Sequence, residues 1–166
     1  MNFQFEIVLI ILCFLVQAVL SGFETAAISL NRFKLFQTAE KGEHSNLILH
    51  FLLDQPKILS TTSIGSNIAI VGSSTISASI FLHFFPEFGS LINTLFLTPF
   101  SLIFAEFLPK SLFYRNAYSS SLLFGPFVRM IYYFIFPFVW LVNQFSRLFL
   151  MALGISYRNE SVFVSR

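Results

Sequence analysis

A single carboxylate closes a long apolar run in the second half of the chain, within residues 103–110 (IFAEFLPK). An ionised glutamate costs several kcal/mol in hydrocarbon, so a residue such as Glu106 usually faces the interior of a helix bundle and binds a partner there. Pro109 lacks a backbone donor and loosens the helix just beyond the carboxylate. The simpler alternative is an i,i+4 ion pair between Glu106 and Lys110 at a helix end.

Two other apolar runs also contain polar side chains. Ser21 lies in residues 20–26 (LSGFETA), whose small residues allow helices to approach closely. Residues 60–67 (STTSIGSN) carry hydroxyls and an amide, which at membrane depth must face protein or a polar cavity. Small residues also recur at every fourth position from Gly65 to Ser77, as on a helix-packing face. Helix packing and ion contact are both open interpretations of this run.

The composition indicates an integral membrane protein that has the lipid bilayer as its surroundings. The 166 residues are 55% hydrophobic and 11% charged, whereas a soluble domain has about 25% charged residues. The mean hydropathy is +0.76, and the apolar residues form continuous blocks. The net charge of +2 comes without a basic stripe, so we expect no nucleic-acid partner. Cys13 is the single cysteine, which excludes a disulfide framework within the chain.

Three uncharged runs predict three transmembrane helices, over residues 7–23, 58–86 and 88–105. The first run is expected to be a retained span rather than a signal peptide, because no Lys or Arg precedes it and it continues to residue 28. The polar segment 31–57 has apolar residues at helical spacing from Leu47 to Leu52, which predicts a short helix on the membrane surface.

The last apolar region is interrupted by Pro126 and Pro137 and is rich in aromatic residues typical of the headgroup level. It predicts two short juxtamembrane helices, over residues 122–128 and 130–146, or a shallow hairpin, rather than a fourth span. The predicted fold class is therefore an all-α membrane protein with three transmembrane helices plus juxtamembrane amphipathic helices.

Charge predicts the orientation. With three spans and the N-terminus outside, all ten Lys and Arg residues lie on the cytoplasmic side, as the positive-inside rule favours. A fourth span would move Arg147, Arg158 and Arg166 outside. The predicted location is the plasma (inner) membrane with a cytoplasmic C-terminus. Ser21, residues 60–67 and Glu106 then lie at similar depth, which suggests one shared site.

Four motifs in this order and spacing resemble the transmembrane domain of the CorC/cyclin M (CNNM) magnesium exporters. They are residues 21–26 (SGFETA), 64–67 (IGSN), 105–110 (AEFLPK) and 137–143 (PFVWLVN). The resemblance implies a membrane domain over residues 1–154 and the start of a cytosolic linker over 155–166. In the family, a pair of nucleotide-binding CBS repeats usually follows. The resemblance also implies a homodimer formed through transmembrane helices, and a transporter rather than an enzyme.

Family members bind a dehydrated Mg²⁺ ion within the membrane and are thought to export it against an inward Na⁺ gradient. By this resemblance, Ser21 matches the family's serine ligand and Glu106 its glutamate ligand. The candidate metal-site residues are Ser21, Gly65, Ser66, Asn67 and Glu106.

The second span departs from the family pattern. Gly65 matches, but Ser66 stands at the first asparagine position and Ile70 at the second, which is a ligand in the family. Asn67 is one residue away, about 100° around a helix. Mg²⁺ requires about six oxygens in near-octahedral geometry, so a missing side-chain oxygen must be replaced or the site is weakened.

Three functional hypotheses follow. The first is a Mg²⁺ exporter coupled to Na⁺, and the second is a non-transporting membrane anchor, scaffold or sensor with a degraded ion site. The third, an intramembrane hydrolase, is disfavoured because the sequence has neither H-E-x-x-H nor G-x-S-x-G.

Overall fold

The computed structural model describes residues 3–30 and 46–152, and within these residues every regular element is a helix. The helices are α1 (Phe3–Ser29), α3 (Asn46–Leu53), α4 (Gln55–Phe84), α5 (Gly89–Phe100), the π-helix η1 (Ser101–Phe107), α6 (Leu108–Arg115) and α7 (Ala117–Ala152). This confirms the all-α class. The predicted linker over residues 155–166 lies outside the described residues, as does the first part of the polar segment, 31–45.

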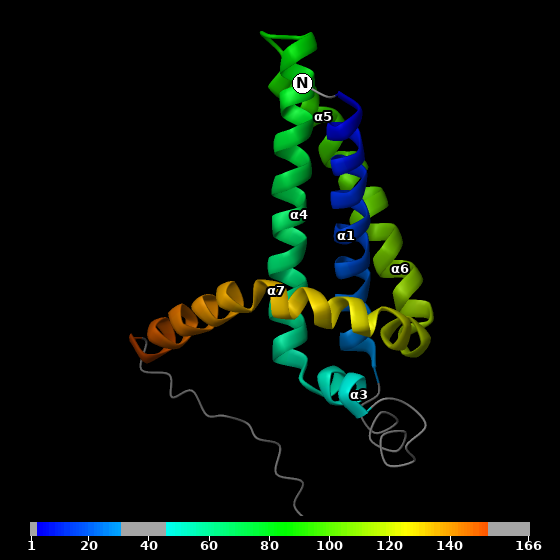
Figure 1. The fold of residues 1–166 in the computed structure, drawn as a ribbon, viewed down its shortest axis with the longest axis vertical. Coiled ribbons are helices and arrows are strands. Elements are labelled where there is room, and N and C mark those ends of the chain that lie inside the picture. The colour runs from blue at the N-terminus through cyan, green and yellow to red at the C-terminus, as the bar shows by residue number, and fades with distance from the viewer. Residues whose placement is uncertain (1–2, 31–45, 153–166) are drawn as a thin grey trace, which may run out of the picture.

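Three long helical stretches form the bundle. α1, α4 and the continuous stretch from α5 through η1 to α6 run along the long axis of the molecule (Figure 1). All three are long and apolar enough to cross a membrane, and they match the three predicted spans, of which the second extends two residues past α4 and the third begins one residue before α5. Their outer surfaces carry large apolar side chains, among them Phe96 and Phe107, which are 69% and 73% exposed. Such a surface fits contact with lipid, so the chain is a multi-pass membrane protein.

Helix α7 differs from the expectation for this region. The two predicted short helices are in fact one helix of 36 residues, with Pro126 and Pro137 inside it. Both proline side chains lie on the exposed surface, where each costs a backbone hydrogen bond and bends the helix without ending it. Residues 117–142 are also long and apolar enough to span, which gives four candidate spans rather than three. In Figure 1, however, α7 lies across α4 and α1 instead of alongside them.

The contact between α1 and α4 depends on small residues. Gly65, Ala69, Ser73 and Ser77 are all buried on α4, as the four-residue spacing predicts. A Cβ atom on Gly65 would lie 2.6 Å from Cδ1 of Leu20, a distance that real Cβ contacts do not show. The glycine therefore lets α1 approach α4 closely, next to Ser66 on one helix and Ser21 on the other.

The buried apolar core lies where α1, α4 and α7 meet α3. Leu20, Phe23, Ile58 and Val128 are fully buried there, and Phe51 of α3 packs against them. Helix α3 confirms the short helix predicted over residues 47–52 of the polar segment. This core holds the C-terminal half of α1 against the N-terminal half of α4. It therefore positions the polar side chains that lie next to it along both helices.

Candidate cation site

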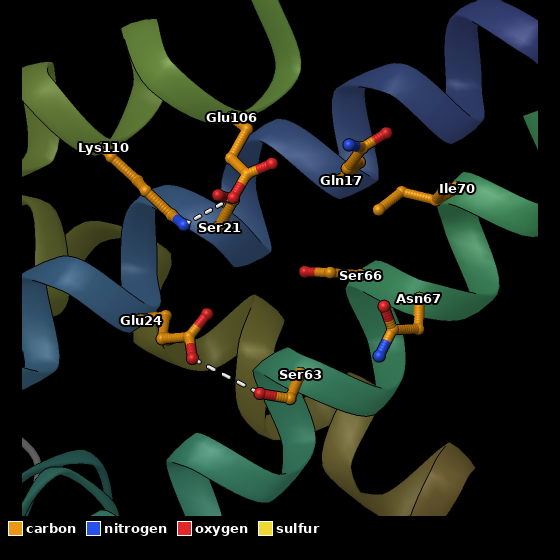
Figure 2. Close-up of a pocket in the computed structure, with 9 residues that line it drawn as sticks. All are labelled: Gln17, Ser21, Glu24, Ser63, Ser66, Asn67, Ile70, Glu106 and Lys110. Atoms are coloured by element: carbon orange, nitrogen blue, oxygen red, sulfur yellow. Dashed lines mark hydrogen bonds and ion pairs between the residues drawn. The ribbon is translucent and has the colours of Figure 1, made fainter. Parts of the chain in front are cut away.

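Polar side chains from three helices line one cavity of about 220 Å³ inside the bundle. Ser21 comes from α1, Ser66 and Asn67 from α4, and Glu106 from η1 (Figure 2). This confirms the expectation that the three polar segments share one location. Gly65 does not line the cavity, because it is buried in the contact with Leu20. Whether the four lining residues bind a metal ion stays a prediction.

Two of the lining hydroxyls have no partner. The Oγ atoms of Ser21 and Ser66 are buried, and neither has a hydrogen-bond partner among the described residues. Other hydroxyls in these helices donate to a backbone carbonyl one turn earlier, as Thr25 does to Ser21 and Thr62 to Ile58. A buried hydroxyl without a partner costs free energy. The two serines therefore present oxygen atoms that a bound ion would satisfy.

The carboxylate of Glu106 is paired within its own helical stretch. Lys110 Nζ donates to Oε1 of Glu106 over 2.8 Å, so the predicted i,i+4 ion pair is present. The same carboxylate lines the cavity with Ser21 and Ser66. The two interpretations of Glu106 are thus compatible, since the lysine supplies the counter-charge in this structure.

Glu106 lies on a π-helix, which sequence periodicity did not predict. The backbone N–H of Leu108 donates to the carbonyl of Ile103, five residues earlier. Pro109 then removes the donor that an α-helix would give to the Ala105 carbonyl, so the hydrogen-bond register changes around the glutamate. Single π-helical turns are frequent at functional sites because they redirect a side chain. Here the turn places the glutamate at the cavity.

Gln17 and Glu24 are among the lining residues that were not predicted as site residues. Gln17 is buried on α1, and its Nε2 donates to Oγ of Ser101 over 3.0 Å. Glu24, one turn below Ser21 on the same helix, accepts a hydrogen bond of 3.3 Å from Ser63 Oγ. Both interrupt apolar or small-residue stretches of the first span, which is the only sequence signal that would have identified them.

Ile70, which departs from the family pattern, is one of the residues that line the cavity. Its side chain lines the cavity beside Gln17, one turn above Ser66 (Figure 2). An amide at this position would add an oxygen to the cavity wall, whereas isoleucine adds only carbon. Asn67 also lines the cavity but is exposed, next to Ser66 on the helix.

The donor set suits a hard cation. The cavity offers hydroxyl, amide and carboxylate oxygens, and it has two carboxylates, Glu24 and Glu106, against one lysine. Mg²⁺ and Na⁺ are bound by oxygen ligands of these kinds, whereas zinc and copper favour imidazole or thiolate. Within residues 3–30 and 46–152 there is no group of three His, Cys, Asp or Glu residues able to hold a metal ion. Any metal bound here would therefore depend on the hydroxyl and amide oxygens as well.

Apolar helices packed around a cavity of oxygen ligands define a multi-pass membrane domain with a candidate cation site. The chain belongs to the family of the cyclin M transmembrane N-terminal domain, which matches it over residues 8–166. This confirms the resemblance to the CorC/cyclin M proteins.

Two curated relatives are similar to this chain. UPF0053 inner membrane protein YfjD of Escherichia coli strain K12 is 32% identical over 145 residues, which are 84% of this chain and 33% of the relative. A UPF0053 protein of Haemophilus influenzae is 27% identical over 159 residues, which are 95% of this chain and 38% of the relative. The chain therefore spans between a third and two fifths of the length of these relatives.

Proposed function

We propose that this chain is the membrane domain of a divalent-cation transporter that exports Mg²⁺ in exchange for Na⁺. The observation that carries the proposal is the pair of buried, unpartnered hydroxyls of Ser21 and Ser66, which line the same cavity as the Glu106 carboxylate. Membership of the cyclin M transmembrane family supports the substrate class. The Na⁺ coupling rests on the family resemblance.

The cavity lining and the family resemblance support a proposed role for each ligand. Glu106 supplies the negative charge that offsets dehydration of the ion, and Ser21 and Ser66 supply neutral oxygens. Asn67 is an additional oxygen donor at the cavity wall. Because Mg²⁺ gives up water reluctantly, the position that Ile70 leaves without an oxygen is filled by a retained water or a backbone carbonyl.

The ion pair with Lys110 gives the site two states. Without the cation, the ammonium group of Lys110 neutralises the partly exposed carboxylate of Glu106. Binding of Mg²⁺ requires the carboxylate to turn from Lys110 or to be shared with it. Lys110 therefore lowers the affinity for the ion and favours its release.

The proposed topology has three spans, with the N-terminus outside and the C-terminus in the cytoplasm, in the plasma (inner) membrane. The direction of α7 across the other helices supports an in-plane helix rather than a fourth span (Figure 1). The start of α4, with Lys57, and the end of α6, with Arg115, lie at the same end of the bundle (Figure 1), which supports the assignment of that end to the cytoplasm. The name of the Escherichia coli relative places that protein in the inner membrane.

Assembly and regulation are proposed by family resemblance. We expect a homodimer formed through the transmembrane helices, and a cytosolic CBS pair in the natural protein if the chain continues as its relatives do. The outward apolar side chains of η1, such as Phe104 and Phe107, are available either to lipid or to a second copy.

The alternative is a membrane anchor or scaffold whose ion site has decayed. Ile70 is the observation that favours it, because its side chain faces the cavity and cannot coordinate an ion. Thermal stabilisation of the purified protein by MgCl₂ separates the two functions. We expect wild type to be stabilised at millimolar Mg²⁺, and Glu106→Gln to lose the effect.

Glu87→Gln is the matched control, since Glu87 lies in the turn that follows the last residue of α4 and does not line the candidate cation site. Wild type without stabilisation, combined with stabilisation of Ile70→Asn, would identify a decayed site and refute the transporter. Equal stabilisation of wild type and Glu106→Gln would instead refute the assignment of the ion to this cavity.

A further inference from the structure

A second polar cavity, of about 210 Å³, lies at the end of the bundle where α3 and α7 meet the start of α4. Its lining residues are His50, Phe51, Asp54, Lys57, Arg129, Tyr132 and Tyr133. None of these residues lines the candidate cation site. The two cavities therefore have separate chemistry.

The position of this cavity matches the headgroup region of a membrane. α4 has 30 residues and is about 45 Å long, whereas the hydrocarbon core is about 30 Å thick. The last turn of α4 carries His83, whereas Asp54 and Lys57 form an ion pair at its first turn, so the length beyond the hydrocarbon includes this charged end. Tyr132 and Tyr133 of α7 lie at the same cavity, and tyrosine is enriched at this level of the membrane.

The charges at the cavity favour an anion. The cavity has two basic side chains, Lys57 and Arg129, and a single carboxylate, Asp54, which is already paired with Lys57. Arg129 has no carboxylate partner among the described residues. Its Nη2 donates to the hydroxyl of Tyr133 over 3.3 Å, and its guanidinium lies 5.7 Å from the centre of that ring. Most of the five guanidinium N–H donors thus remain available, and their planar arrangement suits a phosphate group.

Exposed apolar side chains on α7 follow two of the cavity residues in the sequence and suit an acyl chain. Met130, which follows Arg129, and Phe134, which follows Tyr133, are 62% and 85% exposed. A free phosphate ion would gain nothing from this surface. A phospholipid would place its phosphate on the arginine and its hydrocarbon along α7.

We propose that this cavity binds the headgroup of an anionic phospholipid, with Arg129 as the principal phosphate ligand and Lys57, His50 and Tyr132 around it. Basic pockets between helices at the membrane surface recognise such lipids through the same combination of charge and depth. The bound lipid would hold α7 against α3 and α4. This site does not depend on whether the chain transports Mg²⁺.

The test measures lipid binding to the intact protein in detergent, by native mass spectrometry with added dioleoyl phosphatidylglycerol or dioleoyl phosphatidylcholine. We expect wild type to bind phosphatidylglycerol more tightly than phosphatidylcholine. In Arg129→Gln, the ratio of the two affinities should fall roughly fivefold, as expected for the loss of one basic group at a membrane surface. Arg115→Gln is the matched control, because Arg115 is exposed at the same end of the bundle but does not line the cavity. It should keep the preference.

Asp54→Asn gives an independent prediction in the opposite direction. The change removes the single carboxylate of the cavity, while asparagine can still cap α4 as Asp54 does through its contact with the backbone N–H of Lys57. Binding of phosphatidylglycerol should therefore become tighter. Equal losses in Arg129→Gln and Arg115→Gln, or an unchanged Asp54→Asn, would overturn the proposal. Displacement of phosphatidylglycerol by millimolar inorganic phosphate would overturn the lipid as the source of the phosphate.

Discussion

Lys110 and Glu106 form an ion pair of 2.8 Å one helical turn apart, and each side chain is 38% exposed in the bundle. The pair lies at the cavity that also contains the unpartnered hydroxyls of Ser21 and Ser66. The lysine therefore competes with any cation that uses the Glu106 carboxylate. Under the proposed function, this competition would make the affinity for the cation adjustable through a residue that is not itself a proposed ligand.

Removal of the lysine charge should strengthen cation binding. In Lys110→Met, we expect the Mg²⁺ concentration at half-maximal thermal stabilisation to fall by roughly fivefold, the upper range for a partly exposed ion pair. Lys110→Arg keeps the charge and should behave like wild type. Weaker binding in Lys110→Met would show instead that the lysine holds Glu106 in its binding position.

Ile70 should be the residue that limits the affinity of the site. Ile70→Asn places an amide oxygen at the cavity wall, and a polar contact to a charged group contributes about 1.5 kcal/mol or more, so we expect roughly tenfold tighter binding of Mg²⁺. Ile70→Val retains an apolar side chain and serves as the control. An affinity that does not change in Ile70→Asn would mean that this position does not reach the ion.

The glycine beside Ser21 should be essential for packing. A Cβ on Gly22 would lie 2.6 Å from Cδ2 of Phe113, so Gly22→Ala forces α6 away from α1 and should cost about 1–3 kcal/mol in the free energy of unfolding. Gly72→Ala is a matched control on α4, because its Cβ would meet only Cys13 Sγ, at an ordinary 3.5 Å. Denaturation in mixed micelles measures both. Equal stability of the two variants would contradict the close packing of α1 on α6.

The hydrogen bonds between Gln17 and Ser101 should couple α1 to the π-helix. The amide donates to the hydroxyl over 3.0 Å and accepts from it over 3.4 Å, and the glutamine is buried. A double-mutant cycle with Gln17→Leu and Ser101→Ala should give a coupling energy of about 0.6 kcal/mol, the average for hydrogen bonds between membrane helices, and at most about 1.7 kcal/mol. Additive effects of the two substitutions would show that this contact does not link the two helices.

The sequence predicted the parts of the fold that hydrophobicity determines. Continuous apolar runs identified the three helices of the bundle, and the small residues at four-residue spacing identified the face of α4 that packs on α1. Polar residues at membrane depth identified Ser21, Ser66 and Glu106 as neighbours, since each is costly to expose to lipid.

The remaining features depend on local backbone geometry that residue types alone do not determine. Residues 122–128 and 130–146 were predicted as two separate helices, but α7 continues through both, with Pro126 and Pro137 on its exposed surface. The π-helix around Glu106 shifts the register by one residue, so regular 3.6-residue spacing misplaces the side chains near it. Gln17 was missed because a single amide in an apolar run is also common where helices simply pack.

Binding of Mn²⁺, a paramagnetic substitute for Mg²⁺ that electron paramagnetic resonance detects, tests the shared site of Ser21, Ser66 and Glu106 most directly. Ser21→Ala, Ser66→Ala and Glu106→Gln each remove a hydroxyl or carboxylate from the cavity and should weaken binding. Thr75→Val is the control, because it removes an exposed hydroxyl that already donates to the Val71 carbonyl. We predict that wild type and Thr75→Val bind one Mn²⁺ per chain, that Mg²⁺ displaces it, and that the three site variants lose it. Retention of this Mn²⁺ in a Ser21→Ala, Glu106→Gln double variant would contradict the account.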